Sequence, residues 1–268
     1  MKRIFIFGIA AAIFTFLGCG SQSETTVAQT RQAKPNQITK PTDAKIKTPV
    51  LVELFTSEGC SSCPPADRVL ARLEKEQPSA DAEIITLALH VDYWNSLGWK
   101  DEFSQKQFSE RQNGYAERFK LDSIYTPQMI VDGQTQFVGS NLDTANKAVG
   151  DAAKALKAVI EISNADDKLK IKISDIDAHD DSYVWLAIAE DDLKTDVKRG
   201  ENGGKTLDHI SVARELKLLG TIAATDKIFE TETDVQFDSK WKRENLKFIV
   251  FVQGKNSKRI FGVKKLDN

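Results

Sequence analysis

Short apolar runs and amphipathic segments alternate along the first half of the chain, beginning at residue 49. The runs are rich in β-branched and aromatic residues and predict strands, whereas apolar positions at i, i+3, i+4 and i+7 predict helices. Asp132 and Gly133 stand between two such runs, as in a hairpin turn. The predicted strands are 49–56, 84–91, 128–131 and 135–138, and the predicted helical segments are 66–74, 100–120 and 142–157.

The second half of the chain has a different pattern. Its segments alternate or run apolar over a few residues each, and clusters of Asp, Asn, Lys and Gly separate them. This pattern is typical of an antiparallel, sandwich-like sheet. We therefore expect an α/β domain over 49–157, followed by a mainly antiparallel β domain over 158–268. The predicted strands of the second domain are 159–164, 168–174, 183–190, 246–253 and 259–265.

The segment 1–19 is predicted to be a targeting signal. A short basic end precedes an apolar run over 4–17, which is too short to span a bilayer because a span needs about 20 residues. The run ends in a small residue before Cys19, which is similar to a bacterial lipoprotein signal, so we expect Cys19 to carry lipid. An ordinary signal peptide with a cysteine near its cleavage site is the alternative. The polar segment 20–48 is expected to be a flexible tether.

Composition and charge exclude some classes of function. The 268 residues are 41% hydrophobic and 28% charged, which is enough apolar material for a core. A formal net charge of -2 argues against a nucleic-acid-binding surface. If Cys19 carries lipid, Cys60 and Cys63 remain as a pair that can form a disulfide in an oxidising compartment.

The two paired cysteines lie between a predicted strand and a predicted helix. Peptide N–H groups at a helix N-terminus stabilise a thiolate, so Cys60 is expected to attack, and Cys63 to resolve, in thiol–disulfide exchange with a protein partner. No cofactor is expected. Two alternatives remain open. One is an interaction module whose inert disulfide only ties the turn. The other is a copper- or thiol-binding site without turnover, in which His90 joins the cysteines as a ligand of a soft ion such as Cu(I).

Glu53 interrupts the first apolar run, and a carboxylate there is costly to bury unless it is paired. Either it faces solvent on an exposed side of the strand, or it lies beneath the thiols and takes a proton from Cys63 during exchange.

The order of motifs resembles the thioredoxin fold. Thr126 and Pro127 stand immediately before a predicted strand, after the Cys-x-x-Cys helix and a second strand. In that superfamily the proline at this place is cis, lies beside the redox pair and exposes backbone to an incoming peptide. The resemblance therefore implies a cis bond at Pro127 and peptide contact at Thr126.

Longer strings resemble one bacterial exported family, the domain of unknown function 1223. They are "LFTSEGCSSCPPAD", "HVDYWNSLGWKD", "YTPQMIVDG" and "RGENGGKTLDH". The resemblance extends from about residue 50 to the C-terminus. It implies a thioredoxin-like first domain and does not supply a reaction.

Two of these strings suggest further groups near the cysteines. Trp94 and Trp99 either cradle a partner segment or pack their loop onto the core. The segment 199–209 is not a phosphate-binding loop, because Arg199 stands where the first glycine is required. We hypothesise that it is a Gly-rich connection between strands that packs back on the first domain near the redox pair.

The sequence as a whole predicts an exported, membrane-tethered thiol–disulfide oxidoreductase. Its expected partners are protein thiols and disulfides, and its expected contact with the membrane is the N-terminal lipid. Residue 20 is Gly rather than the Asp that resembles an inner-membrane retention signal, so we expect a periplasm-facing lipoprotein of the outer membrane. The β domain is expected to dock partners.

Overall fold

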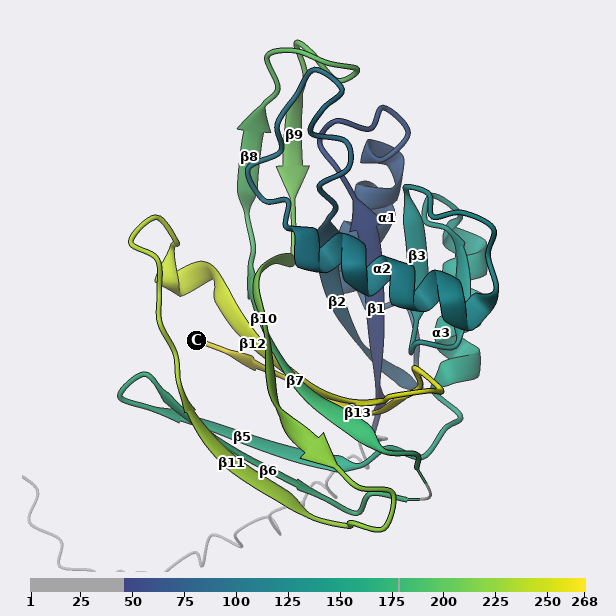
Figure 1. Cartoon of the computed structure of the whole chain (residues 1–268), viewed down its shortest axis with the longest axis vertical. Coiled ribbons are helices and arrows are strands. Elements are labelled where there is room, and N and C mark those ends of the chain that lie inside the picture. The colour runs from purple at the N-terminus through teal and green to yellow at the C-terminus, as the bar shows by residue number, and fades with distance from the viewer. Residues whose placement is uncertain (1–45, 178) are drawn as a thin grey trace, which may run out of the picture. The chain divides into compact units, whose positions relative to one another are not determined.

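One mixed sheet of eight strands organises this computed structural model, which describes residues 46–177 and 179–268 (Figure 1). Its strands, in spatial order, are β13 (Ile260–Asp267), β12 (Leu246–Gly254), β7 (Ser182–Glu190), β10 (Val212–Ile222), β2 (Ala82–His90), β1 (Thr48–Thr56), β3 (Gln128–Val131) and β4 (Thr135–Val138). β2 pairs in parallel with β1 on one side and with β10 on the other, and all other neighbours are antiparallel.

The remaining elements surround this sheet. A three-stranded antiparallel sheet has the order β11-β6-β5, and a separate hairpin pairs β8 with β9. These strands are β11 (Phe229–Asp234), β6 (Lys168–Ser174), β5 (Val159–Ala165), β8 (Leu193–Asp196) and β9 (Thr206–His209). The helices are α1 (Pro64–Glu76), α2 (Lys106–Phe119), α3 (Leu142–Ala152) and the single 3-10 turn η1 (Arg243–Asn245).

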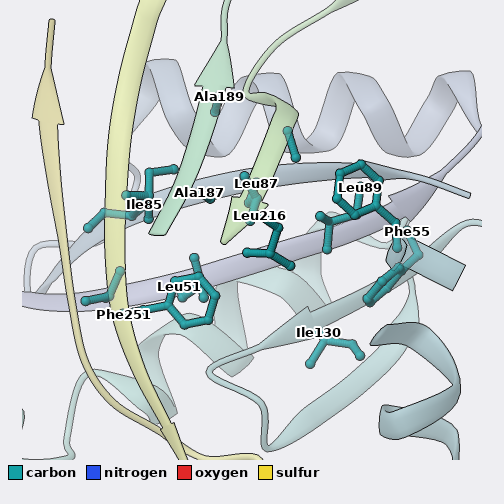
Figure 2. Packing of buried hydrophobic residues seen from close by; sticks show 14 of the residues in the cluster. Leu51, Phe55, Ile85, Leu87, Leu89, Ile130, Ala187, Ala189, Leu216 and Phe251 are labelled. Carbon is teal, nitrogen blue, oxygen red and sulfur yellow. The ribbon is translucent and has the colours of Figure 1, made fainter. Parts of the chain in front are cut away.

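β1 is apolar at successive positions because both of its faces are buried. Side chains alternate across a strand, so Leu51 and Phe55 face one side and Val52 and Leu54 the other. On the first side they pack with Phe108 of α2 and with residues of β7, β10 and β12 (Figure 2). On the second side they pack against apolar residues of α1 and α3. Complete burial of one such side chain stabilises the fold by about 1.5–3 kcal/mol.

The three-stranded sheet packs on the other end of the large sheet. Leu169, Ile171 and Ile173 of β6 are buried and form one cluster with Val184 of β7 and Phe248 of β12. The intervening lysines of β6 face outward, and this alternation is what a sheet buried on one side requires. The small sheet and the part of the large sheet that contains β7 and β12 therefore share one buried apolar cluster.

Strands from both sides of residue 158 share the large sheet, which the sequence prediction of two successive domains did not foresee. The link is β10, whose Val212 pairs with Ala88 of β2 and whose preceding Ser211 accepts a hydrogen bond from Ala88 N at 2.8 Å. β10 was not predicted because its charged and apolar residues follow no regular alternation. The described residues form one compact unit.

The bounds of several predicted elements change. The helix expected within 100–120 begins only at Lys106, and the helix expected over 142–157 ends at Ala152. Strands β8, β9, β10 and β11 were not predicted. The hairpin turn at Asp132 and Gly133 is confirmed, with φ of +53° and +69°.

The N-terminal predictions lie outside the part of the chain that the structure describes. These are the signal 1–19, the lipidation of Cys19 and all but the last three residues of the tether 20–48. Within the described residues, no helix is both long enough and apolar enough to cross a bilayer.

Candidate functional site

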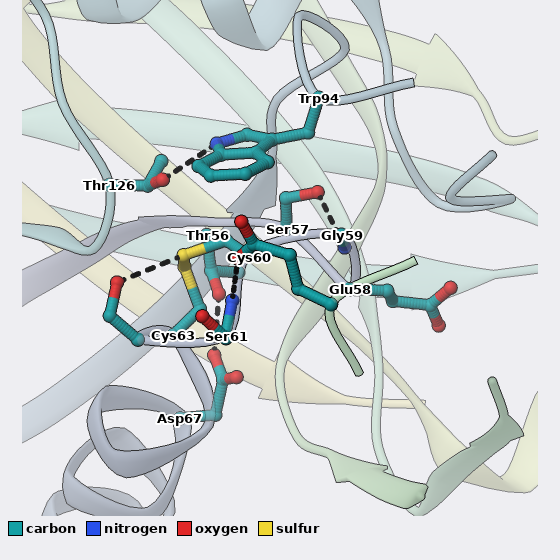
Figure 3. Close-up of a disulfide and its surroundings, with 12 residues drawn as sticks. Thr56, Ser57, Glu58, Gly59, Cys60, Ser61, Cys63, Asp67, Trp94 and Thr126 are labelled. Atoms are coloured by element: carbon teal, nitrogen blue, oxygen red, sulfur yellow. Dashed lines mark hydrogen bonds between the residues drawn. A yellow bond between two sulfur atoms is a disulfide. The ribbon is translucent and has the colours of Figure 1, made fainter. Parts of the chain in front are cut away.

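Cys60 and Cys63 form a disulfide in the turn between β1 and α1, with their Cα atoms 5.4 Å apart (Figure 3). Cys63 is the N-cap of α1, and its carbonyl accepts hydrogen bonds from Ala66 N at 2.8 Å and Asp67 N at 3.0 Å. Both cysteines are fully buried, with 0% of their surface exposed. The sequence prediction did not include this burial.

The start of α1 offers fewer N–H donors to a sulfur than the sequence argument assumed. Pro64 and Pro65 occupy its first two positions and carry no N–H, and Ala66 N is already bonded to a carbonyl. The polar group that does contact a sulfur is the Ser62 hydroxyl, 3.3 Å from Cys60 Sγ. Stabilisation of a Cys60 thiolate therefore depends on this hydroxyl together with the remaining helix dipole.

The loop of the β8–β9 hairpin covers the disulfide turn. Asn202, itself fully buried, donates from Nδ2 to the carbonyls of Glu58 and Cys60, each at 2.9 Å. Glu201 accepts a hydrogen bond from Ser61 N at 2.9 Å. These contacts confirm the hypothesis that the segment 199–209 packs near the cysteines.

Trp94 and Thr126 lie beside the same turn (Figure 3). The indole Nε1 of Trp94 donates to Thr126 Oγ1 at 2.8 Å, and a Cβ on Gly59 would lie 3.2 Å from the Trp94 Cβ. The Thr126–Pro127 bond is cis, as the resemblance to thioredoxin-like proteins implied. Trp94 is only partly buried, and its contact with a partner segment stays a prediction.

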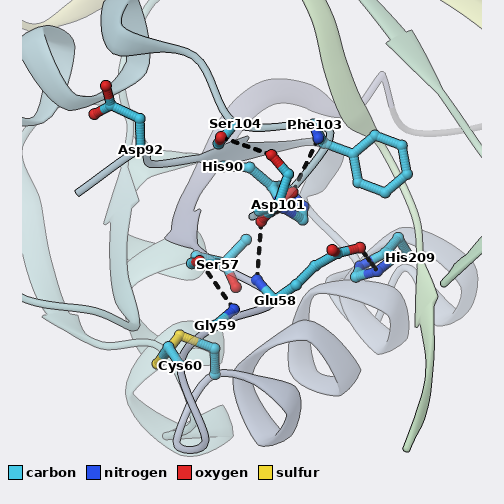
Figure 4. Close-up of polar contacts among 12 residues, drawn as sticks. Ser57, Glu58, Gly59, Cys60, His90, Asp92, Asp101, Phe103, Ser104 and His209 are labelled. Atoms are coloured by element: carbon cyan, nitrogen blue, oxygen red, sulfur yellow. Dashed lines mark hydrogen bonds and ion pairs between the residues drawn. A yellow bond between two sulfur atoms is a disulfide. The ribbon is translucent and has the colours of Figure 1, made fainter. Parts of the chain in front are cut away.

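A cluster of buried acids and histidines lies behind the disulfide turn (Figure 4). Glu58 binds Trp99 Nε1 through Oε2 at 2.7 Å, and its Oε1 is 3.2 Å from His209 Nε2. His90 Nδ1 is 2.7 Å from Asp101 Oδ2, which also accepts from Glu58 N at 2.9 Å. The cluster thus links Glu58, two positions before Cys60, to Asp101 in the loop before α2 and to His209 of β9. Asp101 in turn contacts His90 of β2.

Opposing effects set the pKa values in this cluster. Burial alone would lower the pKa of His90, but the nearby carboxylates of Asp101, Asp67 and Glu58 raise it above its ordinary value. For Asp67, which accepts a hydrogen bond from Thr56 Oγ1 at 2.8 Å, burial dominates and raises the pKa. Burial is the largest single effect on Asp101 and acts to raise its pKa. The interaction with His90 and the backbone hydrogen bonds from Glu58 and Phe103 together outweigh it, so the net shift is downward.

The alternative metal site of Cys60, Cys63 and His90 has no grouped ligands in the structure. Among residues 46–177 and 179–268, no three His, Cys, Asp or Glu side chains are placed as a metal ion would require. His90 instead pairs with Asp101 and lies edge-on to the rings of His209 and Phe103.

Glu53 is buried and paired, so the exposed-face interpretation is wrong. Arg111 Nε lies 2.6 Å from its Oε1, and Tyr115 donates its hydroxyl hydrogen to Oε2. Its partners belong to α2 and neither is a cysteine. Among the described residues, no contact of Glu53 supports a proton-accepting role at Cys63, which stays a prediction.

Sequence reasoning missed Asn202, Asp67, Asp101 and His209. Asp67 lies four residues after Cys63 on α1, and this spacing could have indicated it, because residues at i and i+4 share a helix face. Asn202 is separated from Cys60 by 142 positions, so no local pattern could have paired the two.

Comparison with known proteins gives a family and two similar structures. The profile described as "Protein of unknown function (DUF1223)" matches residues 51–253. No curated protein matches the chain. A crystal structure of an Agrobacterium tumefaciens protein is 25% identical with a TM-score of 0.68, over 83% of this chain and 96% of that one. HBP35 of Porphyromonas gingivalis is 14% identical with a TM-score of 0.56, over 84% and 76%.

Proposed function

We propose that this chain, which belongs to the family of proteins of unknown function DUF1223, is a thiol–disulfide oxidoreductase that works through Cys60 and Cys63. The observation that carries the proposal is the disulfide at a strand-to-helix turn, with the Ser62 hydroxyl 3.3 Å from the first sulfur and Trp94 and Thr126 beside it.

The topology around the disulfide supports a thioredoxin-like interpretation of the first half of the chain. α1 connects the parallel strands β1 and β2, and the antiparallel hairpin of β3 and β4 adds on the other side of β1, with α3 following. The cysteines precede α1, and the cis bond before Pro127 precedes β3. This order of elements places both motifs at the same end of β1.

The proposed exchange proceeds in two steps. A partner thiolate attacks Cys60 Sγ, the Cys60–Cys63 bond breaks, and Cys63 leaves as a thiolate that takes up a proton. A second thiol of the partner, deprotonated, then attacks the partner sulfur of the mixed disulfide, and Cys60 leaves as a thiolate. The partner is oxidised to a disulfide and the pair is reduced to two thiols. The reverse sequence reduces a partner disulfide.

The proposed location follows from the sequence. We propose that the segment 1–19 directs export, that lipid on Cys19 anchors the mature chain to the outer membrane, and that the segment 20–48 connects the anchor to the folded part. Protein thiols and disulfides outside the cytoplasm are then the available partners.

The buried state of both sulfurs favours one competing function, an interaction module whose disulfide is inert. The two functions differ in the reduction potential of the pair. Structural disulfides in secreted proteins have potentials below about -300 mV, whereas exchange-active pairs are less reducing.

The test is thiol trapping of the full chain across a series of glutathione and dithiothreitol redox buffers. We expect half-reduction at a potential above about -300 mV, and a mixed disulfide with partner proteins that accumulates in Cys63→Ser and is absent in Cys60→Ser. A pair that stays oxidised well below that potential, with no trapped partner in Cys63→Ser, would support the inert module instead.

A further inference from the structure

The loop of the β8–β9 hairpin covers the disulfide turn, and only a few side chains of the hairpin, among them Val197, Leu207 and His209, are buried. The hairpin forms its own two-stranded sheet, and none of its residues belongs to the three apolar clusters that hold the described core together. Its loop from residue 198 to 205 is exposed except at Asn202. Segments with few buried apolar contacts open more readily than the core does.

Polar contacts hold the loop of the hairpin down on the disulfide turn. Both N–H bonds of the Asn202 amide go to carbonyls of the turn, and its Oδ1 accepts from Lys205 Nζ at 2.9 Å, so the side chain is fully satisfied. Glu201 satisfies Ser61 N. Gly200, at φ +76°, lies against Trp99, where a Cβ would come within 3.2 Å of the Trp99 Cβ.

The base of the hairpin has the features of a hinge. Asp192 and Ser211 flank the two strands, and both are non-glycine residues at positive φ, +55° and +54°. Two hydrogen bonds attach the base to the large sheet, so that the hairpin would move relative to a fixed point. Ser211 N donates to Asp191 Oδ1 at 2.7 Å, and the Ser211 carbonyl accepts from Ala88 N of β2. Hinges are short terminal positions of this kind, which absorb a backbone change while the elements beyond them stay rigid.

We propose that the β8–β9 hairpin is an autoinhibitory latch, closed by Asn202 and Glu201 over the surface on which a cysteine-containing polypeptide docks. Opening the latch frees two backbone acceptors, at Glu58 and Cys60, and one donor, at Ser61. Backbone acceptors and a donor within four successive residues are groups with which an extended peptide backbone can pair. The latch therefore occupies the place of the partner, and reaction at Cys60 requires it to open.

This inference rests on the proposed function for its partner, but its test does not. The rate at which dithiothreitol reduces the disulfide of the native full chain reports how often the turn is uncovered, whatever the potential of the pair. Asn202→Ala removes both hydrogen bonds from the loop to the carbonyls of the turn, and we expect reduction to be about tenfold faster. Asn164→Ala, on the exposed strand β5, is the matched control and should leave the rate unchanged.

A second variant and a second measurement guard against loss of folding. Glu201→Ala removes only an exposed side chain from the hairpin loop, and we expect faster reduction together with faster hydrogen exchange at the Ser61 amide. Urea unfolding of each variant shows that the fold is retained. Reduction rates within twofold of wild type in both folded variants would overturn the latch. Faster reduction combined with a potential below about -300 mV would retain the latch and reject the oxidoreductase.

Discussion

At the scale of single residues, a few side chains set the chemistry near Cys60. Some of them belong to motifs that the sequence shows, and others are identified only by their contacts in the structure. The cysteine pair and the Thr126–Pro127 bond are visible as local motifs, and Trp94 connects them, because it contacts both Thr126 and Gly59 of the cysteine turn. The prolines at the start of α1 were also visible, but their consequence was not, because only the structure shows that Ser62 contacts Cys60 Sγ in place of backbone donors.

Ser62→Ala should raise the pKa of the Cys60 thiol in the reduced protein by about one unit. A hydrogen bond to a charged group contributes about 1.5–3 kcal/mol, and one pKa unit corresponds to about 1.4 kcal/mol. We expect the lower end of this energy range, because the exposed Ser62 hydroxyl also competes with water. The measurement is the pH dependence of alkylation at Cys60 in a Cys63→Ser background. Ser61→Ala is the control, and an equal shift in both variants would contradict the role of Ser62.

His90 should make the stability of the fold depend on pH. Its pKa is raised in the folded state by Asp101 and the other carboxylates of the cluster, against the effect of burial. The folded state therefore binds this proton more tightly than the unfolded state. The resulting stabilisation is complete below the unfolded pKa of about 6.5 and is lost as pH rises through the higher folded pKa.

We therefore expect the stability advantage of wild type over His90→Gln to be largest near about pH 5.5 and to shrink toward about pH 8. Urea unfolding at several pH values measures the difference. His179→Gln is the control, because His179 lies outside the cluster and binds the carbonyls of Asp180 and Asp226. A difference that is constant across this pH range would show that His90 carries no linked proton.

At the scale of elements, regular alternation and helical spacing identified the strands and helices whose apolar residues recur at a fixed period. β1, β2, β3 and β6 were found because their apolar patterns match the sides they bury. β10 was missed because its charged and apolar residues do not alternate regularly, and β11 because Phe229 is its only apolar residue. β8 and β9 were missed because each has a single apolar residue, Leu193 and Leu207.

The turn between β3 and β4 should tolerate no side chain at Gly133. This residue has a φ of +69°, and a Cβ there would lie 1.8 Å from the Lys258 carbonyl oxygen, which is backbone and cannot rotate away. We expect Gly133→Ala to lower the free energy of unfolding by about 3 kcal/mol.

Gly150→Ala is the matched substitution inside α3, where an added Cβ meets nothing within 4 Å. Alanine favours a helix interior over glycine, so this variant should be more stable by about 0.5–1 kcal/mol. Urea unfolding compares the two. Similar stability changes in both variants would mean that the Lys258 backbone moves aside without cost.

At the scale of the whole molecule, the two halves of the chain depend on each other. The cluster that contains Phe55 and Ile85 also contains Ala187 and Phe251, which come from β7 and β12. The sequence suggested two domains because strand and helix patterns alternate in the first half, whereas the second half has only short strand patterns. No pattern could show that β2 pairs with a strand more than a hundred residues later.

The isolated segment 49–157 should therefore not unfold cooperatively. Without β10, β2 becomes an exposed edge, and without Phe251 the inner side of β1 loses a fully buried neighbour. Near-ultraviolet circular dichroism and urea titration of the fragment and the full chain test this expectation. A sharp transition in the fragment, with retained aromatic signal, would show an autonomous domain.

The distance along the chain between Cys60 and Asn202 also sets an order of events during synthesis. Asn202 follows Cys60 by 142 positions. At ribosomal rates of about 5–20 residues per second, Asn202 is added on the order of ten seconds after Cys60. Until Asn202 is made, the hydrogen bonds from the hairpin loop to the disulfide turn cannot form, so the loop covers the cysteine pair only late in synthesis.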